Sequence, residues 1–474
     1  MPEIRWLIDA SYFIAAVLFI LGLKKMSSPV TARKGIVWAG MGMILATAVT
    51  FLTPSESTTL MPADNIVLMV IAIAIGGSIA WISGKKVAMT DMPQMVAIYN
   101  GMGGGAAAGI AAVEFARGHM HGTVLFTLAA LGALIGSISF SGSCVAFAKL
   151  QGLMNKAFRL PAQNIVNIAL ALVTLGLGVA IVWFGQGASP GSNAVIPGWL
   201  LISFFICALA LGVIVTLPIG GADMPVVISL FNAFTGLAVG FEGYVLNNPA
   251  LIIAGIVVGA AGTLLTQLMA KAMNRSILNI LFQPISGEAQ AGGAIEGTMK
   301  EVSALDAAAM MRYANRVIII PGYGMAVAGA QHKVWEMTES LENAGVNVRF
   351  AIHPVAGRMP GHMNVLLAEA GVPYDKIFDL EEINSDFNQA DVALVIGAND
   401  VVNPVARTDK SSPIYGMPIL NADYASNVIV IKRGQGAGYS GIENALFFKD
   451  NCRMLYGSAQ KVVVDVIHNL KTME

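Results

Sequence analysis

The sequence predicts a polytopic α-helical membrane domain followed by an α/β domain with an open parallel sheet. Only 12% of the 474 residues are charged and the mean hydropathy is +0.68, values that exclude an ordinary soluble protein. Residues 1–274 carry long apolar runs, whereas residues 275–474 hold most of the charge and all but two of the six histidines. In this second part, strand-like and helix-like stretches alternate, which is typical of a parallel sheet covered by helices.

Nine transmembrane helices are expected, because nine segments reach the roughly 20 apolar residues that a span requires. They are residues 5–23, 35–53, 65–84, 91–115, 123–148, 163–185, 196–217, 223–246 and 249–272. Most lysines and arginines then fall on one side, with Arg5 and Arg117 on the other, so the positive-inside rule places the N-terminus outside and the C-terminal domain in the cytoplasm. The first segment lacks a small-residue cleavage site, so we expect it to be retained as a helix.

Composition also limits the partners that the chain is expected to bind. A net charge of −1 and a pI near 6.6 provide no basic field, so nucleic acid is not expected as a partner. The three cysteines, Cys144, Cys207 and Cys452, are far apart and lack metal-ligand spacing. We therefore expect buried thiols and no metal site.

The tripeptide Asp-Met-Pro occurs twice in the apolar part, and each copy is followed at the same distances by an asparagine and a glycine. The copies are Asp91–Pro93 with Asn100 and Gly104, and Asp223–Pro225 with Asn232 and Gly236. Each aspartate is expected to cap the cytoplasmic start of a helix, with proline in its first turn. Nine residues at 1.5 Å each then place each asparagine about 13 Å deep, near the bilayer midplane.

Two interpretations of these amides remain open. The asparagines either hydrogen-bond between helices that the glycines allow to approach, or they line a path for a proton or small cation. The candidate proton-pathway residues are Asn100, Asp223, Asn232 and Gly236. Glu114 and Glu242, near the outer ends of the same two helices, are either solvated helix ends, which we favour, or proton entry points.

The boundary between the two domains is expected at a linker over residues 275–305. Between Phe282 and Val302 the sequence loses periodicity and gains Gly, Ala, Gln and Glu. The membrane domain is thus expected over 1–274 and the α/β domain over 306–474. In the latter we expect strands at 316–321, 346–352, 392–397 and 428–432, a helix that ends near 344 and another near 361–370.

The first of these strands runs into Pro321-Gly-Tyr-Gly-Met-Ala-Val327 and a helix, which is the context of a Rossmann-like dinucleotide fingerprint, although Val327 replaces its last small residue. The second strand ends at His353 without the carboxylate that an NAD site uses for the ribose. Lys432 and Arg433 end a later strand before a glycine-rich loop, and such a basic pair suits a 2′-phosphate. The sequence therefore predicts NADP(H) rather than NAD(H).

Two further loops, from His353 to His362 and from Gly397 to Asn403, are explained either by turn chemistry or by ligand contact. Ligand contact is favoured, because all four loops would converge on one edge of the sheet. Arg358 suits a pyrophosphate, and Asp400 suits a nicotinamide or ribose. The candidate catalytic residues are Tyr323 and Asp400, and the candidate cofactor-binding residues are Gly322, Tyr323, Gly324, Met325, Ala326, Val327, Arg358, Gly397, Asn399, Asp400, Lys432, Arg433, Gly438 and Tyr439.

In this order, and together with Ile219-Gly-Gly-Ala-Asp-Met-Pro225, these motifs resemble over nearly the whole chain the beta subunit of proton-translocating NAD(P) transhydrogenase. The resemblance implies a separate alpha chain that carries the NAD(H) domain and further membrane helices. It also implies a dimer of alpha–beta units in a bacterial inner membrane. The expected activity is hydride transfer between NADH and NADP⁺, coupled to proton movement across the membrane.

The resemblance also implies roles for individual residues. Those expected to contact the dinucleotide are Gly322, Tyr323, Gly324 and Arg358, with Lys432 and Arg433 on the 2′-phosphate and Asp400 near the nicotinamide. Asn232 and Asp223 are expected to belong to the proton-linked machinery. Several members of the family have a histidine where this chain has Asn100, so here the proton either passes two amides through water or uses an ionisable group of the partner chain.

Two alternative functions are kept. One is a membrane transporter whose cytoplasmic nucleotide domain senses redox state, which predicts ion flux without hydride exchange. The other is a membrane-anchored NADPH reductase that passes electrons to quinone, although no flavin, haem or iron–sulfur motif supports it.

Overall fold

The structure is a computed structural model that describes residues 2–52, 63–118, 120–154, 158–186, 195–221, 223–282, 297–359, 361–410, 412, 414–434 and 440–473. The chain divides into two compact units. The first comprises Met1–Met154, Phe158–Leu217 and Ile228–Leu265, and the second includes Pro218–Val227 and Thr266–Glu474.

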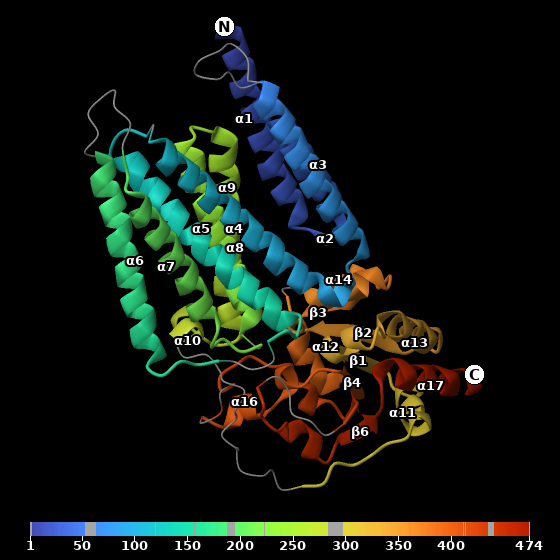
Figure 1. Cartoon of the computed structure of the whole chain (residues 1–474). Coiled ribbons are helices and arrows are strands. Elements are labelled where there is room, and N and C mark those ends of the chain that lie inside the picture. Colours follow the sequence, from blue (N-terminus) through green and yellow to red (C-terminus); the bar gives the residue numbers. More distant parts are fainter. Residues whose placement is uncertain are drawn as a thin grey trace. The chain divides into compact units, whose positions relative to one another are not determined.

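The first unit is built from long helices (Figure 1). Its helices are α1 (Pro2–Met26), α2 (Pro29–Thr50), α3 (Ala63–Lys86), α4 (Met92–Arg117), α5 (Thr123–Leu150), α6 (Gln163–Gln186), α7 (Gly198–Thr216), α8 (Met224–Val245) and α9 (Pro249–Ala272), and the short η1 (Met89–Asp91) precedes α4. A helix coincides with each segment predicted from the sequence. Within the described ranges, eight of these helices have the length and apolarity of membrane spans, and α2 is not among them.

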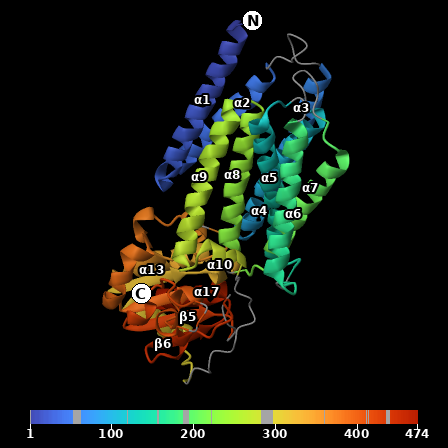
Figure 2. The same ribbon diagram turned by 90° about the vertical axis from the view of Figure 1, so that its left-hand side faces the viewer.

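Close packing in this unit depends on glycines. A Cβ atom on Gly104 of α4 would lie 2.9 Å from the carbonyl oxygen of Gly136 on α5, and one on Gly236 of α8 would lie 2.8 Å from Cα of Gly259 on α9. Figure 2 shows α8 and α9 side by side. The glycines that follow the two repeated asparagines therefore bring a neighbouring helix close, as predicted.

The second unit contains a sheet of six parallel strands in the order β3-β2-β1-β4-β5-β6. The strands are β1 (Arg316–Pro321), β2 (Asn347–Ile352), β3 (Ile377–Asp379), β4 (Val392–Ile396), β5 (Asn427–Lys432) and β6 (Cys452–Tyr456). After β3 the chain returns to pair β4 with the opposite side of β1. The strand order thus reverses between β1 and β4, whose carboxyl ends lie side by side.

Alternate residues of the strands face opposite sides of the sheet. On one side Ile318, Val395 and Val430 join a buried apolar cluster with Phe387 and Leu446. The helix α17 (Ala459–Thr472) packs against both α11 (Ala304–Arg312) and α13 (Gln331–Asn343) beside the sheet (Figure 1). The remaining elements are α10 (Ile277–Phe282), α12 (Tyr323–Val327), α14 (His362–Glu369), α15 (Leu380–Ile383), α16 (Val405–Thr408), η2 (Tyr374–Lys376), η3 (Asn384–Gln389), η4 (Asp400–Val402), η5 (Ala422–Tyr424) and η6 (Ala445–Phe448).

Several local expectations differ from the structure. The helix predicted after β1 is broken between α12 and α13, where Gly329 adopts a φ of +61° that ends the first helix. The predicted linker 275–305 contains α10, and its residues 283–296 lie outside the described part of the chain. The thiol of Cys452 is buried as expected, whereas Cys144 and Cys207 are partly exposed.

Candidate functional site

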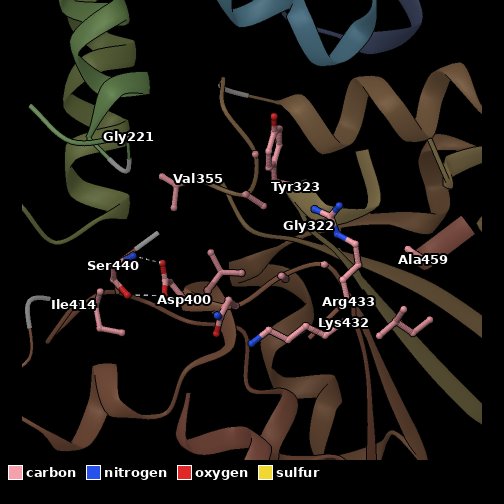
Figure 3. A pocket seen from close by; sticks show the side chains of 18 of the residues that line it. Gly221, Gly322, Tyr323, Val355, Asp400, Ile414, Lys432, Arg433, Ser440 and Ala459 are labelled. Carbon is pink, nitrogen blue, oxygen red and sulfur yellow. Dashed lines mark hydrogen bonds between the residues drawn. The ribbon is translucent and has the colours of Figure 1, made fainter. Parts of the chain in front are cut away.

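A cavity of about 540 Å³ lies at the carboxyl ends of the strands in the second unit (Figure 3). Residues that follow β1, β4 and β5 line it, and they include the predicted Gly322, Tyr323, Gly324, Gly397, Asn399, Asp400, Lys432 and Arg433. The loop after β2 contributes Val355 and Gly357. The prediction that four loops converge on one edge of the sheet is therefore confirmed. In parallel sheets, ligands bind where the strand order reverses.

Three glycines hold the loops after β1 and β4 together, backbone against backbone. The amide of Gly322 donates to the carbonyl oxygen of Ile396 and that of Gly324 to the carbonyl oxygen of Gly397, each at 2.9 Å. Gly397 adopts a φ of +67°, and a Cβ atom there would lie 2.6 Å from the backbone nitrogen of Met325. These glycines thus serve the contact between the two loops, a role that the sequence pattern did not reveal.

Two basic side chains at the end of β5, Lys432 and Arg433, line the cavity. The Lys432 ammonium lies 4.6 Å from the ring centroid of Phe447. Burial lowers the pKa of Lys432, and the nearby negative charge of Asp400 partly opposes that shift. A phosphate beside Lys432 and Arg433 would favour the charged ammonium again, so this pair fits an anionic ligand.

Asp400 is held by Ser440, a residue of the glycine-rich segment Gly434–Gly441 that follows β5. Its carboxylate accepts hydrogen bonds from the backbone nitrogen and the hydroxyl of Ser440, at 3.0 and 2.7 Å (Figure 3). The side-chain amide of Asn444 donates to the backbone and side-chain oxygens of Asn399, at 2.9 and 3.0 Å. Sequence reasoning missed Ser440 and Asn444. Ser440 belongs to the glycine-rich loop that was noticed, whereas nothing in the sequence marks Asn444.

The remaining described residues that we predicted to bind the cofactor do not line the cavity. The Arg358 guanidinium carbon lies 4.3 Å from the ring centroid of Tyr323, beside the cavity. The structure does not bring Met325, Ala326 or Val327 into the lining, since the first two are buried residues of α12 and the third is exposed outside the cavity. The predicted residues Gly438 and Tyr439 lie outside the described part of the chain.

A buried histidine fixes the loop after β2. The imidazole Nε2 of His353 lies 2.7 Å from the carbonyl oxygen of Pro418, and Nδ1 accepts a hydrogen bond from the backbone nitrogen of Val355. These two partners assign the proton to Nε2. Burial lowers the pKa of His353 to about 4, and the hydrogen bond to Pro418 opposes part of that shift. The imidazole is therefore neutral at neutral pH.

The two Asp-Met-Pro copies differ in their surroundings. Asp223 is fully buried, and its carboxylate accepts hydrogen bonds from the guanidinium of Arg275 at 3.0 and 3.2 Å. Asp91 stands at the N-cap of α4, but its side chain makes no capping hydrogen bond and instead lies 3.4 Å from Nε2 of Gln94. The prediction of a capping side chain is therefore wrong for Asp91.

A polar cluster joins α4, α5 and α8 within the first unit. The hydroxyls of Ser139 on α5 and Thr235 on α8 lie 2.6 Å apart, and Thr235 donates to the carbonyl oxygen of Asn100 on α4 at 3.2 Å. The Asn100 amide donates to the hydroxyl of Ser143 at 3.4 Å. Asn232 is half-buried one turn before Thr235. Sequence reasoning found Asn100 but missed the hydroxyls, because serine and threonine are common in apolar helices.

The expectation for Glu242 is wrong. We favoured solvated helix ends for Glu114 and Glu242, but only 1% of the surface of Glu242 is exposed. Glu114 follows the expectation more closely, since its carboxylate pairs with Arg117 at 3.5 Å. The two glutamates therefore have different environments even though they occupy similar sequence positions.

The long apolar helices and the parallel sheet with its basic cavity define a membrane protein that carries an α/β ligand-binding domain. The family model of the NAD(P) transhydrogenase beta subunit matches residues 8–469. Two similar proteins, both named NAD(P) transhydrogenase subunit beta and both from Rhodospirillum rubrum, are 47% identical over 472 residues, which cover 97% of this chain and 98% of theirs. The chain belongs to the NAD(P) transhydrogenase beta subunit family. That membership implies binding of NADP(H) and NAD(H) in the assembly, and an alpha subunit as partner.

Proposed function

We propose that this chain binds NADP(H) and couples hydride transfer between NADH and NADP⁺ to proton movement into the cell. The balanced reaction is NADH + NADP⁺ + H⁺ (outside) to NAD⁺ + NADPH + H⁺ (inside). The observation that carries the proposal is the convergence of Gly322, Gly397, Lys432 and Arg433 on one cavity where the strand order reverses. The order 3-2-1-4-5-6 is that of dinucleotide-binding Rossmann folds.

Each part of the cavity then has a role. Lys432 and Arg433 hold the 2′-phosphate, and Tyr323 with Arg358 stacked beside it holds the pyrophosphate. Asp400 and Tyr323 lie near the nicotinamide. NADP(H) itself supplies the hydride chemistry, so the protein contributes positioning and the exclusion of water. The hydrogen bonds from Ser440 to Asp400 hold these two residues together at the edge of this site.

The membrane part completes the proposal. Nine helices cross a bacterial inner membrane, with the N-terminus outside and the α/β domain in the cytoplasm, and two alpha–beta units form a dimer. The second nicotinamide arrives on the alpha subunit, because one nucleotide fold cannot present both. Proton movement past Asn232 and Asp223 changes the affinity for NADP(H), and the linkage is reciprocal.

The test is hydride transfer in vesicles that contain this chain together with its alpha subunit. We expect transfer from NADH to an NADP⁺ analogue, with proton movement that an uncoupler abolishes. Ion flux without hydride exchange would favour a transporter with a redox-sensing domain, and an assembled complex without exchange would contradict the assignment.

Nucleotide choice is tested in the same vesicles with the double variant Lys432→Gln/Arg433→Gln. It should lose affinity for NADPH by roughly tenfold or more, because both charged partners of the 2′-phosphate are removed. Affinity for NADH on the alpha subunit should be unchanged. The matched control is Lys461→Gln, an exposed lysine on α17.

A further inference from the structure

A seam of hydrogen bonds joins the loop after β4 to residues 440–445, where the glycine-rich segment ends. The side-chain amide of Asn403, which is fully buried, donates to the carbonyl oxygen of Glu443 at 3.0 Å. Its oxygen accepts from the backbone nitrogen two residues further on, at 3.3 Å. Asn444, with 2% of its surface exposed, donates to both oxygens of Asn399. The two stretches of backbone are therefore fixed to each other, because a buried amide that loses its partner is destabilising.

Ser440 lies at the start of this seam, with 2% of its surface exposed. Its hydroxyl oxygen accepts a hydrogen bond from the backbone nitrogen of Ile442 at 3.3 Å, and the hydroxyl donates to Oδ1 of Asp400 at 2.7 Å. A hydroxyl has one hydrogen and two lone pairs. Because the amide of Ile442 occupies a lone pair, the hydrogen is directed at the carboxylate.

The carboxylate of Asp400 is held at both oxygens. Oδ2 accepts from the backbone nitrogen of Ser440 at 3.0 Å, while Oδ1 accepts from the hydroxyl. The terminal torsion of an aspartate is soft, so one donor alone leaves the carboxylate plane free to turn. Hydrogen bonds to a charged acceptor are roughly twice as strong as neutral ones. A carboxylate has about four acceptor sites, so Asp400 can still accept from a ligand in the cavity that both residues line.

The basic end of the cavity is held by different contacts. Phe447, which is buried just beyond the seam, lies beneath the Lys432 ammonium, with 4.6 Å between the nitrogen and the ring centroid. Lys432 precedes the glycine-rich segment and Phe447 follows it. Removal of the Ser440 hydroxyl leaves this contact and the asparagine contacts in place. The hydroxyl thus affects the Asp400 end of the cavity and not the basic end.

We propose that Ser440 is a positioning residue for hydride transfer, whose hydroxyl fixes the Asp400 carboxylate beside the nicotinamide. The hydroxyl takes no part in the chemistry and acts through Asp400. Hydride transfer depends on the exact placement of the nicotinamide ring, so a carboxylate that turns away lowers the rate without releasing the nucleotide. This inference rests on the proposed function, which puts Asp400 near the nicotinamide, and adds the residue that orients it.

The first test measures single-turnover hydride transfer from NADH to saturating NADP⁺ in the alpha–beta complex. Ser440→Ala should lower the rate by roughly tenfold, because it removes one hydrogen bond to a charged group and keeps the backbone one. The affinity for NADPH should stay within about twofold, since the basic pair is untouched. The matched control is Thr338→Val on α13, which removes a buried hydroxyl that donates to Val334 at 2.9 Å outside the cavity.

Two further variants distinguish a hydrogen-bond donor from a space-filling residue. Ser440→Thr keeps the hydroxyl and should retain more of the rate than Ser440→Ala. Ser440→Cys has nearly the volume of serine but only a weak donor, so it should be as slow as Ser440→Ala. A role in packing alone predicts the reverse order, with cysteine faster than threonine. NADPH affinity, which reports folding, is measured for each variant.

A double-mutant cycle tests whether the hydroxyl acts through Asp400. In an Asp400→Asn background the charged acceptor is gone, so Ser440→Ala should change the remaining single-turnover rate by less than about twofold. A further tenfold loss in that background would show that the hydroxyl contacts the nucleotide itself, which would overturn the proposed role.

The outcomes separate this inference from the proposed function. A wild-type complex that exchanges hydride, combined with an unchanged rate in Ser440→Ala, would overturn the inference alone. So would a Ser440→Ala variant whose slower rate is fully restored by raising the concentration of NADP⁺. A wild-type complex that exchanges no hydride would instead contradict the proposed function.

Discussion

At the residue scale, Gly397 combines two constraints that are usually separate. Its φ of +67° favours glycine, and the contact with the loop after β1 leaves no space for a side chain. Gly329 has a similar φ of +61°, but a Cβ atom there would meet nothing within 4 Å. A comparison of substitutions at the two glycines therefore distinguishes the effect of backbone strain from that of steric overlap.

Gly397→Ala should destabilise the α/β domain by roughly 3 kcal/mol and weaken NADPH binding, because strain and overlap add. Gly329→Ala should cost about 1 kcal/mol and leave NADPH binding unchanged. Thermal unfolding with and without NADPH measures both effects. Equal losses of NADPH affinity would show that the contact between the loops does not shape the cavity.

His353 predicts a dependence of stability on pH. Its pKa in the folded protein is lowered to about 4 from the ordinary value of 6.5, so the imidazole contributes its full stability above pH 6.5. As the pH falls from 6.5 towards 4, His353 binds a proton in the unfolded chain but not in the folded chain. About 3 kcal/mol of stability should be lost over that window. His353→Gln should reduce this loss, and exposed His468→Gln should retain it, in unfolding measured from pH 7.5 to 4.

Single residues also show where sequence reasoning stops. Lys432 and Arg433 were predicted because a basic pair at a strand end before glycines has a direct chemical meaning. Ser440, Asn444 and the burial of Glu242 were not, because they depend on neighbours 40 or more residues away. A glutamate three residues from a helix end looks solvated until the helix packed against it is known.

At the scale of elements, α8 and α9 pack through a line of glycines. A Cβ atom on Gly255 would lie 2.5 Å from Cα of Gly240, and one on Gly262 would lie 2.9 Å from Cα of Ala233. In lipid, such close approach replaces the hydrophobic driving force with dispersion contacts between backbones. The pair should therefore be sensitive to single methyl groups.

Gly255→Ala should destabilise the membrane part by roughly 1–3 kcal/mol, because α8 and α9 must move apart. Gly176→Ala on α6, where a Cβ atom meets open space, should be neutral or slightly stabilising. The measurement is thermal unfolding of the purified complex in detergent. A loss as large for Gly176→Ala would show that helix propensity, rather than packing, controls both sites.

The elements differ in how readily the sequence predicts them. All of the long helices of the first unit were predicted, because a run of about 20 apolar residues rarely forms anything except a membrane-spanning helix. The strands β1, β4 and β5 were predicted from their buried β-branched runs. The strand β3 has only three residues, and β6 carries Arg453 near its start. Neither sequence can be distinguished from that of a loop.

At the scale of the whole molecule, the proposed orientation rests on the distribution of charge. Lys85 and Lys86 end α3, and Lys24 and Lys25 end α1, on the side assigned to the cytoplasm. His121, between α4 and α5, lies on the side assigned to the outside. The Lys85 ammonium lies 4.5 Å from the ring centroid of Trp81, a pairing that suits the interface between lipid and water.

This orientation predicts which positions an impermeant maleimide can reach in intact cells. In a background with Cys144, Cys207 and Cys452 replaced by alanine, His121→Cys should react at once. Lys86→Cys should react after permeabilisation, because its end of α3 faces the cytoplasm under the positive-inside rule. The reverse pattern would put the NADP(H) cavity outside the cell, away from its nucleotide pool, and would contradict inward proton movement as the source of NADPH.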